Sequence, residues 1–153
     1  MQLIELVEKE NIIFFNGDFT KEEIIKKFGE ILSKDGLGLS SDKIYNALIE
    51  REKLGSTAVG EEVAIPHAKL DSISKASIAI AVSRNGIDFD APDKLAVKLF
   101  FVVLFPESDI AGHLKTLARI SRLVKMTDFK SRVLSSSNME EVLEILKEEE
   151  SKV

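Results

Sequence analysis

The sequence predicts a single α/β domain, residues 1–153, in which a mixed β-sheet with parallel and antiparallel pairs is sandwiched by α-helices. Amphipathic helical segments alternate with short apolar segments, which is the order that places helices on the faces of a sheet. Residues 97–105 are nearly continuous in Leu, Phe and Val, as in a central strand covered on both faces. Residues 75–82 alternate small and large side chains, as in a strand whose two faces differ.

Two helices are expected in the first third of the chain. Thr20 opens a capping box, and an apolar helical face continues from there until residues 34–36 stop it. Ser40 or Ser41 caps a second helix, which places Arg51 in its last turn. A cation at that end interacts favourably with the helix dipole, by about 0.3–1 kcal/mol, and this alone would account for Arg51.

The last third of the chain is expected to be helical. Residues 109–125 should form a largely buried helix with Leu114 among its inward side chains. Residues 128–134 form a shorter helix, and Asn138 caps a final one. The acidic end of that final helix, residues 148–150, is expected to fray into solvent.

The middle of the chain contains a turn signal and a proline that is expected to end a strand. Asn85-Gly86 is a dipeptide typical of tight hairpin turns. Residues 63–65 form a short apolar strand, after which Pro66 removes a backbone donor and should end the pairing. His67 is therefore expected at a strand end, where a rigid sheet gives way to a loop.

The composition excludes several classes of protein. The formal net charge is −5, and no block of basic residues gathers along the chain, so nucleic acid is not an expected partner. The absence of cysteine removes disulfides, thiolate nucleophiles and cysteine metal sites. The longest apolar run, residues 99–105, is shorter than the roughly 20 residues that span a bilayer, and no secretory signal follows Met1. We expect a cytoplasmic protein without membrane insertion.

The chain contains only two histidines, and both lie where chemistry is possible. A histidine, with an ordinary pKa of about 6.5, can act as a nucleophile or a proton acceptor near neutrality. His113 begins the helix that follows the central strand, and strand ends on one sheet edge converge, so it could face His67. A surface or structural role is the alternative for each histidine.

Ser56 and Thr57 follow Gly55 and offer hydroxyls and amides of the kind that hold phosphate oxygens, although such runs are more often simple loops. Neither a Walker-type lysine loop nor a Rossmann glycine motif occurs, and no His-x-x-x-His pair suggests zinc. The sequence therefore indicates no cofactor and no metal.

One segment is recognisable as a motif. It reads Glu52, six residues, Val59, Gly60, two residues, and then Val63-Ala64-Ile65-Pro66-His67-Ala68. This order resembles the phosphohistidine signature of the enzyme IIA domains in the fructose, mannitol and nitrogen-regulatory branch of the bacterial phosphotransferase system (PTS, type 2). The arginine and hydroxyl segment at 51–57 and the second histidine, His113, also resemble that family. The resemblance covers essentially the whole chain and implies a mannitol/fructose enzyme IIA-like fold.

The resemblance implies a phosphoryl relay that needs no cofactor. His67 would accept a phosphoryl group from the phosphohistidine of HPr, on the ring nitrogen distal to the main chain, and pass it to an enzyme IIB domain. His113 would lie beside the phosphoryl group, Arg51 would neutralise its charge, and Ser56 and Thr57 would help to bind it. The alternative is a nitrogen-regulatory protein whose phosphorylation state acts on a partner protein instead of on sugar uptake.

The chain departs from many relatives by carrying Ala58, Glu62 and Ala68 where those have glycine. A positive φ at any of these positions would cost a side chain on the order of 1 kcal/mol. Glu61 and Glu62 either bring negative charge toward the phosphate or point outward toward a basic face of HPr.

A third interpretation is a hydrolase that uses one histidine as a base and the other as an acid on a phosphodiester. Neither His67 nor His113 is followed two places on by the hydroxyl that two-histidine phosphodiesterases use, which disfavours it.

Overall fold

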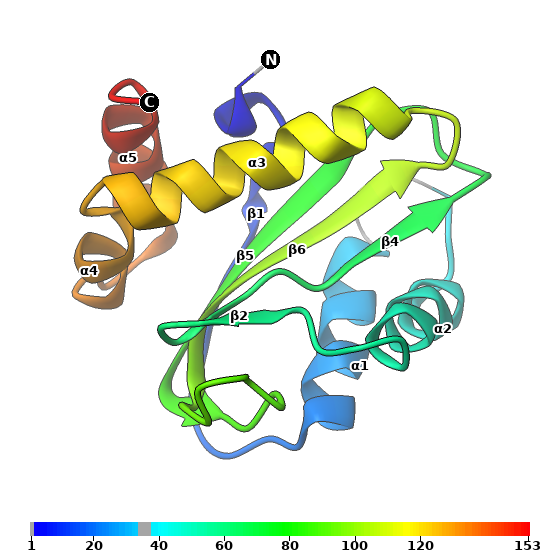
Figure 1. Ribbon diagram of the computed structural model, residues 1–153, viewed down its shortest axis with the longest axis horizontal. Coiled ribbons are helices and arrows are strands. Elements are labelled where there is room, and N and C mark those ends of the chain that lie inside the picture. Colours follow the sequence, from blue (N-terminus) through cyan, green and yellow to red (C-terminus); the bar gives the residue numbers. More distant parts are fainter. Residues whose placement is uncertain (1, 34–37) are drawn as a thin grey trace.

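The computed structural model describes residues 2–33 and 38–153, and it shows a mixed six-stranded sheet with helices on both faces (Figure 1). The strands are β1 (Val7–Phe15), β2 (Ala58–Gly60), β3 (Val63–Ala64), β4 (His67–Leu70), β5 (Ser77–Ile87) and β6 (Val97–Pro106). The helices are the 3₁₀ turn η1 (Leu3–Glu5), α1 (Lys21–Leu32), α2 (Ser41–Glu52), α3 (Ile110–Met126), α4 (Phe129–Leu134) and α5 (Met139–Glu150). The predicted fold class is confirmed.

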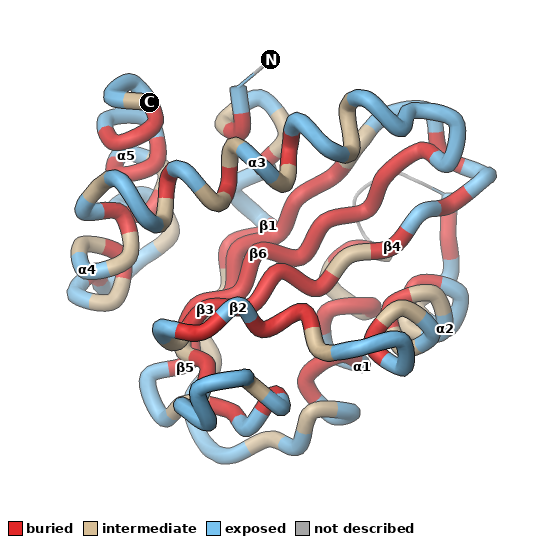
Figure 2. Tube along the Cα trace, viewed as in Figure 1, coloured by how far each residue is buried: buried red, intermediate tan, exposed pale blue. Residues whose placement is uncertain are grey.

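Strand β6 is the central strand, as its apolar sequence predicts. It pairs antiparallel with β5 on one side and parallel with both β3 and β4 on the other. Strand β1 lies parallel to β5, and β2 is antiparallel to β3 at the opposite end of the sheet. Almost every residue of β6 is buried, because helices cover both of its faces (Figure 2).

The alternation along β5 divides the core into two layers, as predicted. Ala79 and Ala81 face the layer that contains the apolar side chains of α1 and α2. Ile78 and Ile80 face the layer that contains those of α3, α4 and α5. Small side chains on the first face leave room for helices to approach the sheet closely.

The predicted helix starts are confirmed. Thr20 and Glu23 make both hydrogen bonds of the capping box of α1. Ser40 caps α2 by accepting a hydrogen bond from the Lys43 amide, and Arg51 lies in the last turn of that helix. The predicted stop signal at residues 34–36 falls outside the described residues.

The prediction of a hairpin turn at Asn85-Gly86 is wrong. Both residues lie inside β5, at a point where its register with β6 shifts. Gly86 has a φ of +78°, and a Cβ there would come within 2.7 Å of the Ala96 Cβ. The dipeptide therefore forms a β-bulge, and the hairpin is closed by the loop at residues 88–96.

The prediction that α3 is largely buried, with Leu114 inward, is also wrong. Leu114 is 63% exposed, and the buried row consists of Thr116, Ile120 and Leu123. This row has the spacing i, i+4, i+7 and is rotated from the predicted one, so the first turns of α3 keep exposed apolar side chains such as Ile110.

The acidic end of α5 does not fray into solvent. Glu149 and Glu150 are both buried, at 1% and 2% exposure. The Glu150 carboxylate accepts hydrogen bonds from the amides of Leu3 and Ile4, so it joins the two ends of the described chain. Within the described ranges, no helix is both long and apolar enough to cross a membrane.

Candidate functional site

His67 opens a strand instead of ending one, which corrects the prediction that Pro66 stops the pairing. The register with β6 is unchanged across the interruption, since Ala64 pairs with Phe100 and His67 with Val103. Pro66 lacks only a donor, and its carbonyl still accepts a hydrogen bond from the Val103 amide at 2.9 Å. His67 thus projects from β4, whose only strand partner in the described sheet is β6.

The ring of His67 is oriented by a hydrogen bond to its own segment. Its Nδ1 lies 2.7 Å from the carbonyl oxygen of Ile65. A carbonyl can only accept, so Nδ1 carries the proton and the lone pair of the neutral ring is on Nε2. Burial lowers the pKa of His67 below its ordinary value; the bond to Ile65 opposes this change, and the charge of Arg51 adds to it. The ring is therefore neutral at pH 7.

His113 meets His67 from the first turn of α3. Asp109 caps this helix by accepting a hydrogen bond from the Gly112 amide at 3.0 Å. The His113 ring stacks on Phe105, with centroids 4.1 Å apart and planes at 22°, and its centroid lies 5.4 Å from that of His67. The predicted convergence of the two histidines is confirmed. The pKa of His113 is lowered first by burial, then by His67, and then by the positive charges of Lys69 and Arg51.

Arg51 shares a cleft with both histidines. Its Nη1 donates a hydrogen bond of 2.8 Å to the carbonyl of Gly55, just past the end of α2. The cleft has a volume of about 590 Å³. We call it the histidine cleft, and it is lined by Ala47, Glu50, Arg51, Leu54, His67, Ala68, Lys69, Glu107 and His113. Strand β4 brings His67 to the sheet edge, where α2 and α3 approach from opposite faces (Figure 1).

Ser56 and Thr57 do not line the histidine cleft. The Ser56 hydroxyl donates to the Phe89 carbonyl at 2.6 Å and accepts from the Ala58 amide at 3.1 Å. The buried Thr57 hydroxyl donates to the Glu52 carboxylate. Both hydroxyls therefore have partners within the protein, which attach the 53–58 loop to Phe89 and to α2, and the predicted phosphate-binding role of Ser56 and Thr57 stays a prediction.

The sequence interpretation missed several side chains that line the cleft. Lys69 stands two places after His67 in β4, so strand periodicity puts both on the same face. Glu107 follows the end of β6 directly. Alternation along residues 67–70 was the signal that could have identified Lys69.

Of the three positions that replace a glycine, only Glu62 has a left-handed backbone. Its φ is +71°, and Glu61 before it has a φ of +56°, whereas Ala58 and Ala68 are not among the described residues with positive φ. The two glutamates form the turn between β2 and β3, and each carries the cost that a side chain incurs there, about 1 kcal/mol.

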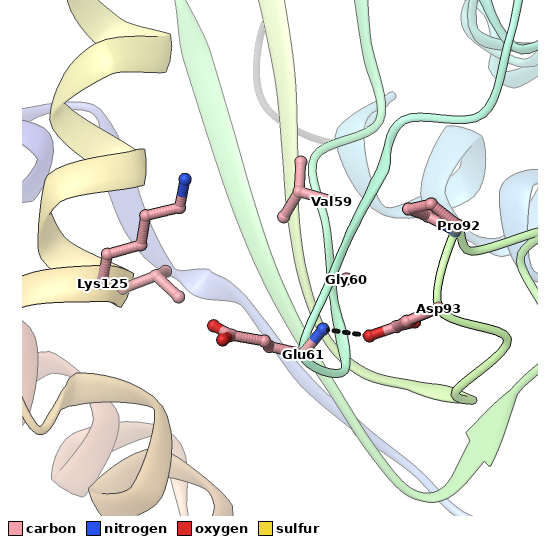
Figure 3. A pocket seen from close by; sticks show the side chains of 7 residues that line it. Val59, Gly60, Glu61, Pro92, Asp93 and Lys125 are labelled. Atoms are coloured by element: carbon pink, nitrogen blue, oxygen red, sulfur yellow. Dashed lines mark hydrogen bonds between the residues drawn. The ribbon is translucent and has the colours of Figure 1, made fainter.

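These two glutamates lie away from the histidine cleft. The Glu61 amide donates to the Asp93 carboxylate at 2.8 Å, and Glu61 lines a second cleft of about 680 Å³ between the β2–β3 turn and the end of α3 (Figure 3). The Glu62 carboxylate is 3.2 Å from the ammonium of Lys98. Neither lines the cleft that contains His67, so neither brings its negative charge into that cleft, and contact of these glutamates with HPr stays a prediction.

Known proteins resemble this chain in sequence and in structure. It is 36% identical over 129 residues to a "PTS system fructose-specific EIIA component" of Haloferax volcanii, with 84% of each chain covered. It is 39% identical over 109 residues to a "Nitrogen regulatory protein" of Bradyrhizobium diazoefficiens, with 71% of each covered. The structure superposes on nitrogen regulatory protein IIA-Ntr of Neisseria meningitidis with a TM-score of 0.87 at 30% identity, over 94% of this chain and 98% of that one.

The superposition on the IIA mannitol protein of Escherichia coli has a TM-score of 0.74 at 26% identity, over 91% of this chain and 97% of that one. Residues 5–149 match the family described as "Phosphoenolpyruvate-dependent sugar phosphotransferase system, EIIA 2". Sugar-specific and nitrogen-regulatory proteins both occur among the relatives. The protein therefore belongs to the type-2 EIIA family of the phosphoenolpyruvate-dependent sugar phosphotransferase system.

Proposed function

We propose that the protein is a phosphocarrier that accepts a phosphoryl group from phospho-HPr on Nε2 of His67 and passes it to an enzyme IIB domain of the fructose or mannitol class. One observation supports this most directly. The Ile65 carbonyl holds the proton of His67 on Nδ1, which leaves the Nε2 lone pair available as a nucleophile. The lowered pKa keeps that lone pair unprotonated at neutral pH.

The transfer exchanges one nitrogen–phosphorus bond for another. The Nε2 lone pair of His67 forms the new bond while the bond to the donor imidazole breaks, and the donor nitrogen keeps that electron pair. The His67 ring then bears positive charge, with its proton still on Nδ1. The hydrogen bond to the Ile65 carbonyl stabilises this charged ring. Attack by the acceptor on phosphorus restores the neutral ring.

Arg51 and His113 supply positive charge and a hydrogen bond around the transferring group. A guanidinium presents a planar set of donors that matches phosphoryl oxygens, and the bond to Gly55 restrains it beside the cleft. Stacking on Phe105 fixes the plane of the His113 ring next to His67. Ser56 and Thr57 are not assigned to the phosphoryl group in this mechanism, because their hydroxyls donate to the Phe89 carbonyl and to the Glu52 carboxylate.

A regulatory role is the second candidate. The high TM-score with the Neisseria nitrogen regulatory protein favours it, whereas the Haloferax fructose-specific relative favours sugar transport. Both roles use the same phosphorylated histidine, and they differ in the fate of the phosphoryl group. Incubation of the labelled protein with a fructose-class IIB domain separates them: rapid loss of label to IIB supports the carrier role, and retention supports regulation.

The assignment of His67 is tested by labelling from phospho-HPr. His67→Ala should abolish the acid-labile phosphoryl label, because the nucleophile is gone. His113→Ala should still take up label but transfer it onward more slowly, because the neighbouring ring is lost. Acid-labile label on folded His67→Ala protein would refute the assignment.

A further inference from the structure

Glu52 is a buried carboxylate next to Arg51 in sequence, and the transfer chemistry does not use it. Its side chain is only 4% exposed. It accepts hydrogen bonds from both the amide of Thr57, at 3.1 Å, and the Thr57 hydroxyl. The ammonium of Lys21 lies 3.0 Å from the same carboxylate. A carboxylate that is buried with three partners is held in one position, which indicates that this position matters to the protein.

A continuous series of hydrogen bonds leads from this carboxylate to His67. The Thr57 carbonyl accepts from the Ile65 amide at 3.0 Å, and the Ile65 carbonyl accepts from Nδ1 of His67 at 2.7 Å. Ile65 falls in the gap between β3 and β4, so its amide bonds to Thr57 and not to β6. The position of the Ile65 carbonyl therefore depends on Thr57, and the position of Thr57 depends on Glu52.

We propose that Glu52 is a positioning residue that fixes which ring nitrogen of His67 carries the proton, acting through Thr57 and the Ile65 carbonyl. Loss of its acceptor oxygens frees Thr57, displaces the Ile65 carbonyl and lets the His67 proton move to Nε2. The nucleophilic lone pair is then on the wrong nitrogen. The consequence for transfer rate rests on the proposed function, but the protonation of the ring does not.

A purely structural role for Glu52 would have a different signature. The ion pair with Lys21 joins α2 to α1, and Lys21 also pairs with Asp90 at 3.1 Å. If that pair were the whole role, loss of Glu52 would lower the free energy of unfolding and leave His67 unchanged. The negative charge of Glu52 also raises the pKa of His67, so charge and hydrogen bonding have to be separated.

Nitrogen-15 NMR of the two histidine rings makes that separation. Each ring nitrogen reports whether it is protonated, and His113 serves as the reference within the same molecule. Glu52→Ala should shift the His67 ratio of Nδ1–H to Nε2–H rings by about 5- to 10-fold, because the restraint on the accepting carbonyl is lost. Glu52→Gln keeps an oxygen for the Thr57 amide, so it should keep the ratio and only lower the His67 pKa. Thr57→Val removes the hydroxyl donor and leaves the amide bond to Glu52 in place, so like Glu52→Gln it should keep the ratio.

Transfer from phospho-HPr is the second measurement. Glu52→Ala should take up label on the order of 10-fold more slowly than the unchanged protein, with Glu52→Gln restoring most of the rate. An unchanged His67 ratio in folded Glu52→Ala protein would overturn the inference, even if transfer slowed. Should Glu52→Ala not fold, Glu52→Asp decides the question, since it keeps the charge near Lys21 but withdraws the carboxylate from Thr57. If the unchanged protein takes up no label, the proposed function fails while the NMR result still stands.

Discussion

At the scale of single residues, the charge of Arg51 is the feature of the histidine cleft most open to a direct test. Arg51→Ala should slow uptake of the phosphoryl group by about 100-fold, because the guanidinium would stabilise the oxygens most strongly during transfer. The free energy of unfolding should change by less than about 1 kcal/mol, because its hydrogen bond to Gly55 is exposed. Rates of labelling and urea unfolding curves measure both effects.

Lys53→Ala is the matched control for Arg51. Lys53 follows α2 directly, carries the same charge, and forms an exposed ion pair with Glu50 instead of lining the cleft. Its loss should leave the transfer rate unchanged. A similar loss of rate in both variants would mean that positive charge anywhere at the end of α2, and not the position of Arg51, assists transfer.

The two histidines also set a pH dependence of stability. In the folded protein both pKa values lie below the ordinary 6.5 of the unfolded chain. At a pH between the folded and the unfolded pKa, the unfolded chain therefore binds more protons than the folded protein. The free energy of unfolding should therefore fall as the pH is lowered through 6.5 and below it. The double variant His67→Gln/His113→Gln, which has no histidine left, should lose less stability between pH 7.5 and 5.5. Urea unfolding at the two pH values tests this, and equal losses in both proteins would contradict it.

At the scale of elements, the bulge in β5 makes the sharpest prediction. Gly86→Ala should lower the free energy of unfolding by about 2–4 kcal/mol, because the new Cβ adopts a left-handed φ of +78° and meets Ala96 at 2.7 Å. Gly17→Ala is the matched control: its φ is +96°, but nothing lies within 4 Å of the new Cβ. It should cost only about 1–2 kcal/mol. Equal losses would show that backbone conformation alone, without the contact, sets the cost.

The elements that sequence predicts correctly are those whose signal is local. The apolar run of β6, the capping box at Thr20 and the cap at Asn138 depend on residues only a few positions apart. Asn85-Gly86 was misassigned because its conformation also suits a bulge, and only the position of the facing strand decides between the two. Pro66 was misassigned because a missing donor does not prevent its carbonyl from joining a ladder.

The residues of the candidate site were also predicted only in part. His67, His113 and Arg51 were identified from chemistry and motif, and the structure brings all three into one cleft. The phosphate-binding role of Ser56 and Thr57 stays a prediction, because it rests on residue type alone. The residue type did not indicate their partners within the protein, such as the Phe89 carbonyl that accepts from Ser56. Long-range partners of this kind leave no signal in local residue order.

At the scale of the whole molecule, the site depends on how the two layers meet. Arg51 comes from α2 on one face of the sheet and His113 from α3 on the other, while His67 lies on the edge strand between them. A residue in the middle of the sheet could not be reached from both layers. The edge position of β4 therefore explains how one imidazole meets a guanidinium and a second ring.

The layer that carries α3 is joined to both ends of the chain by one carboxylate. Glu150, at the end of α5, accepts hydrogen bonds from the Leu3 amide at 2.6 Å and from Nε of Arg119 in α3 at 2.5 Å, and it is 2% exposed. Among the described residues, Glu150 is the only acidic residue that forms an ion pair with Arg119, and Glu150→Ala removes it. The guanidinium and the amide then lose their acceptor while still buried or partly buried.

We expect Glu150→Ala to lower the free energy of unfolding by about 3–5 kcal/mol, the cost of leaving one partner of a buried ion pair unmatched. Hydrogen exchange at the Leu3 amide should accelerate as well, because the N-terminal turn loses its attachment to α5. Glu148→Ala is the control, since Glu148 is 47% exposed and pairs with Arg132 at the surface, where the loss should stay below about 1 kcal/mol. Similar losses in the two variants, or unchanged exchange at Leu3, would show that the chain ends are held by apolar packing and that the Glu150 carboxylate is not what joins them.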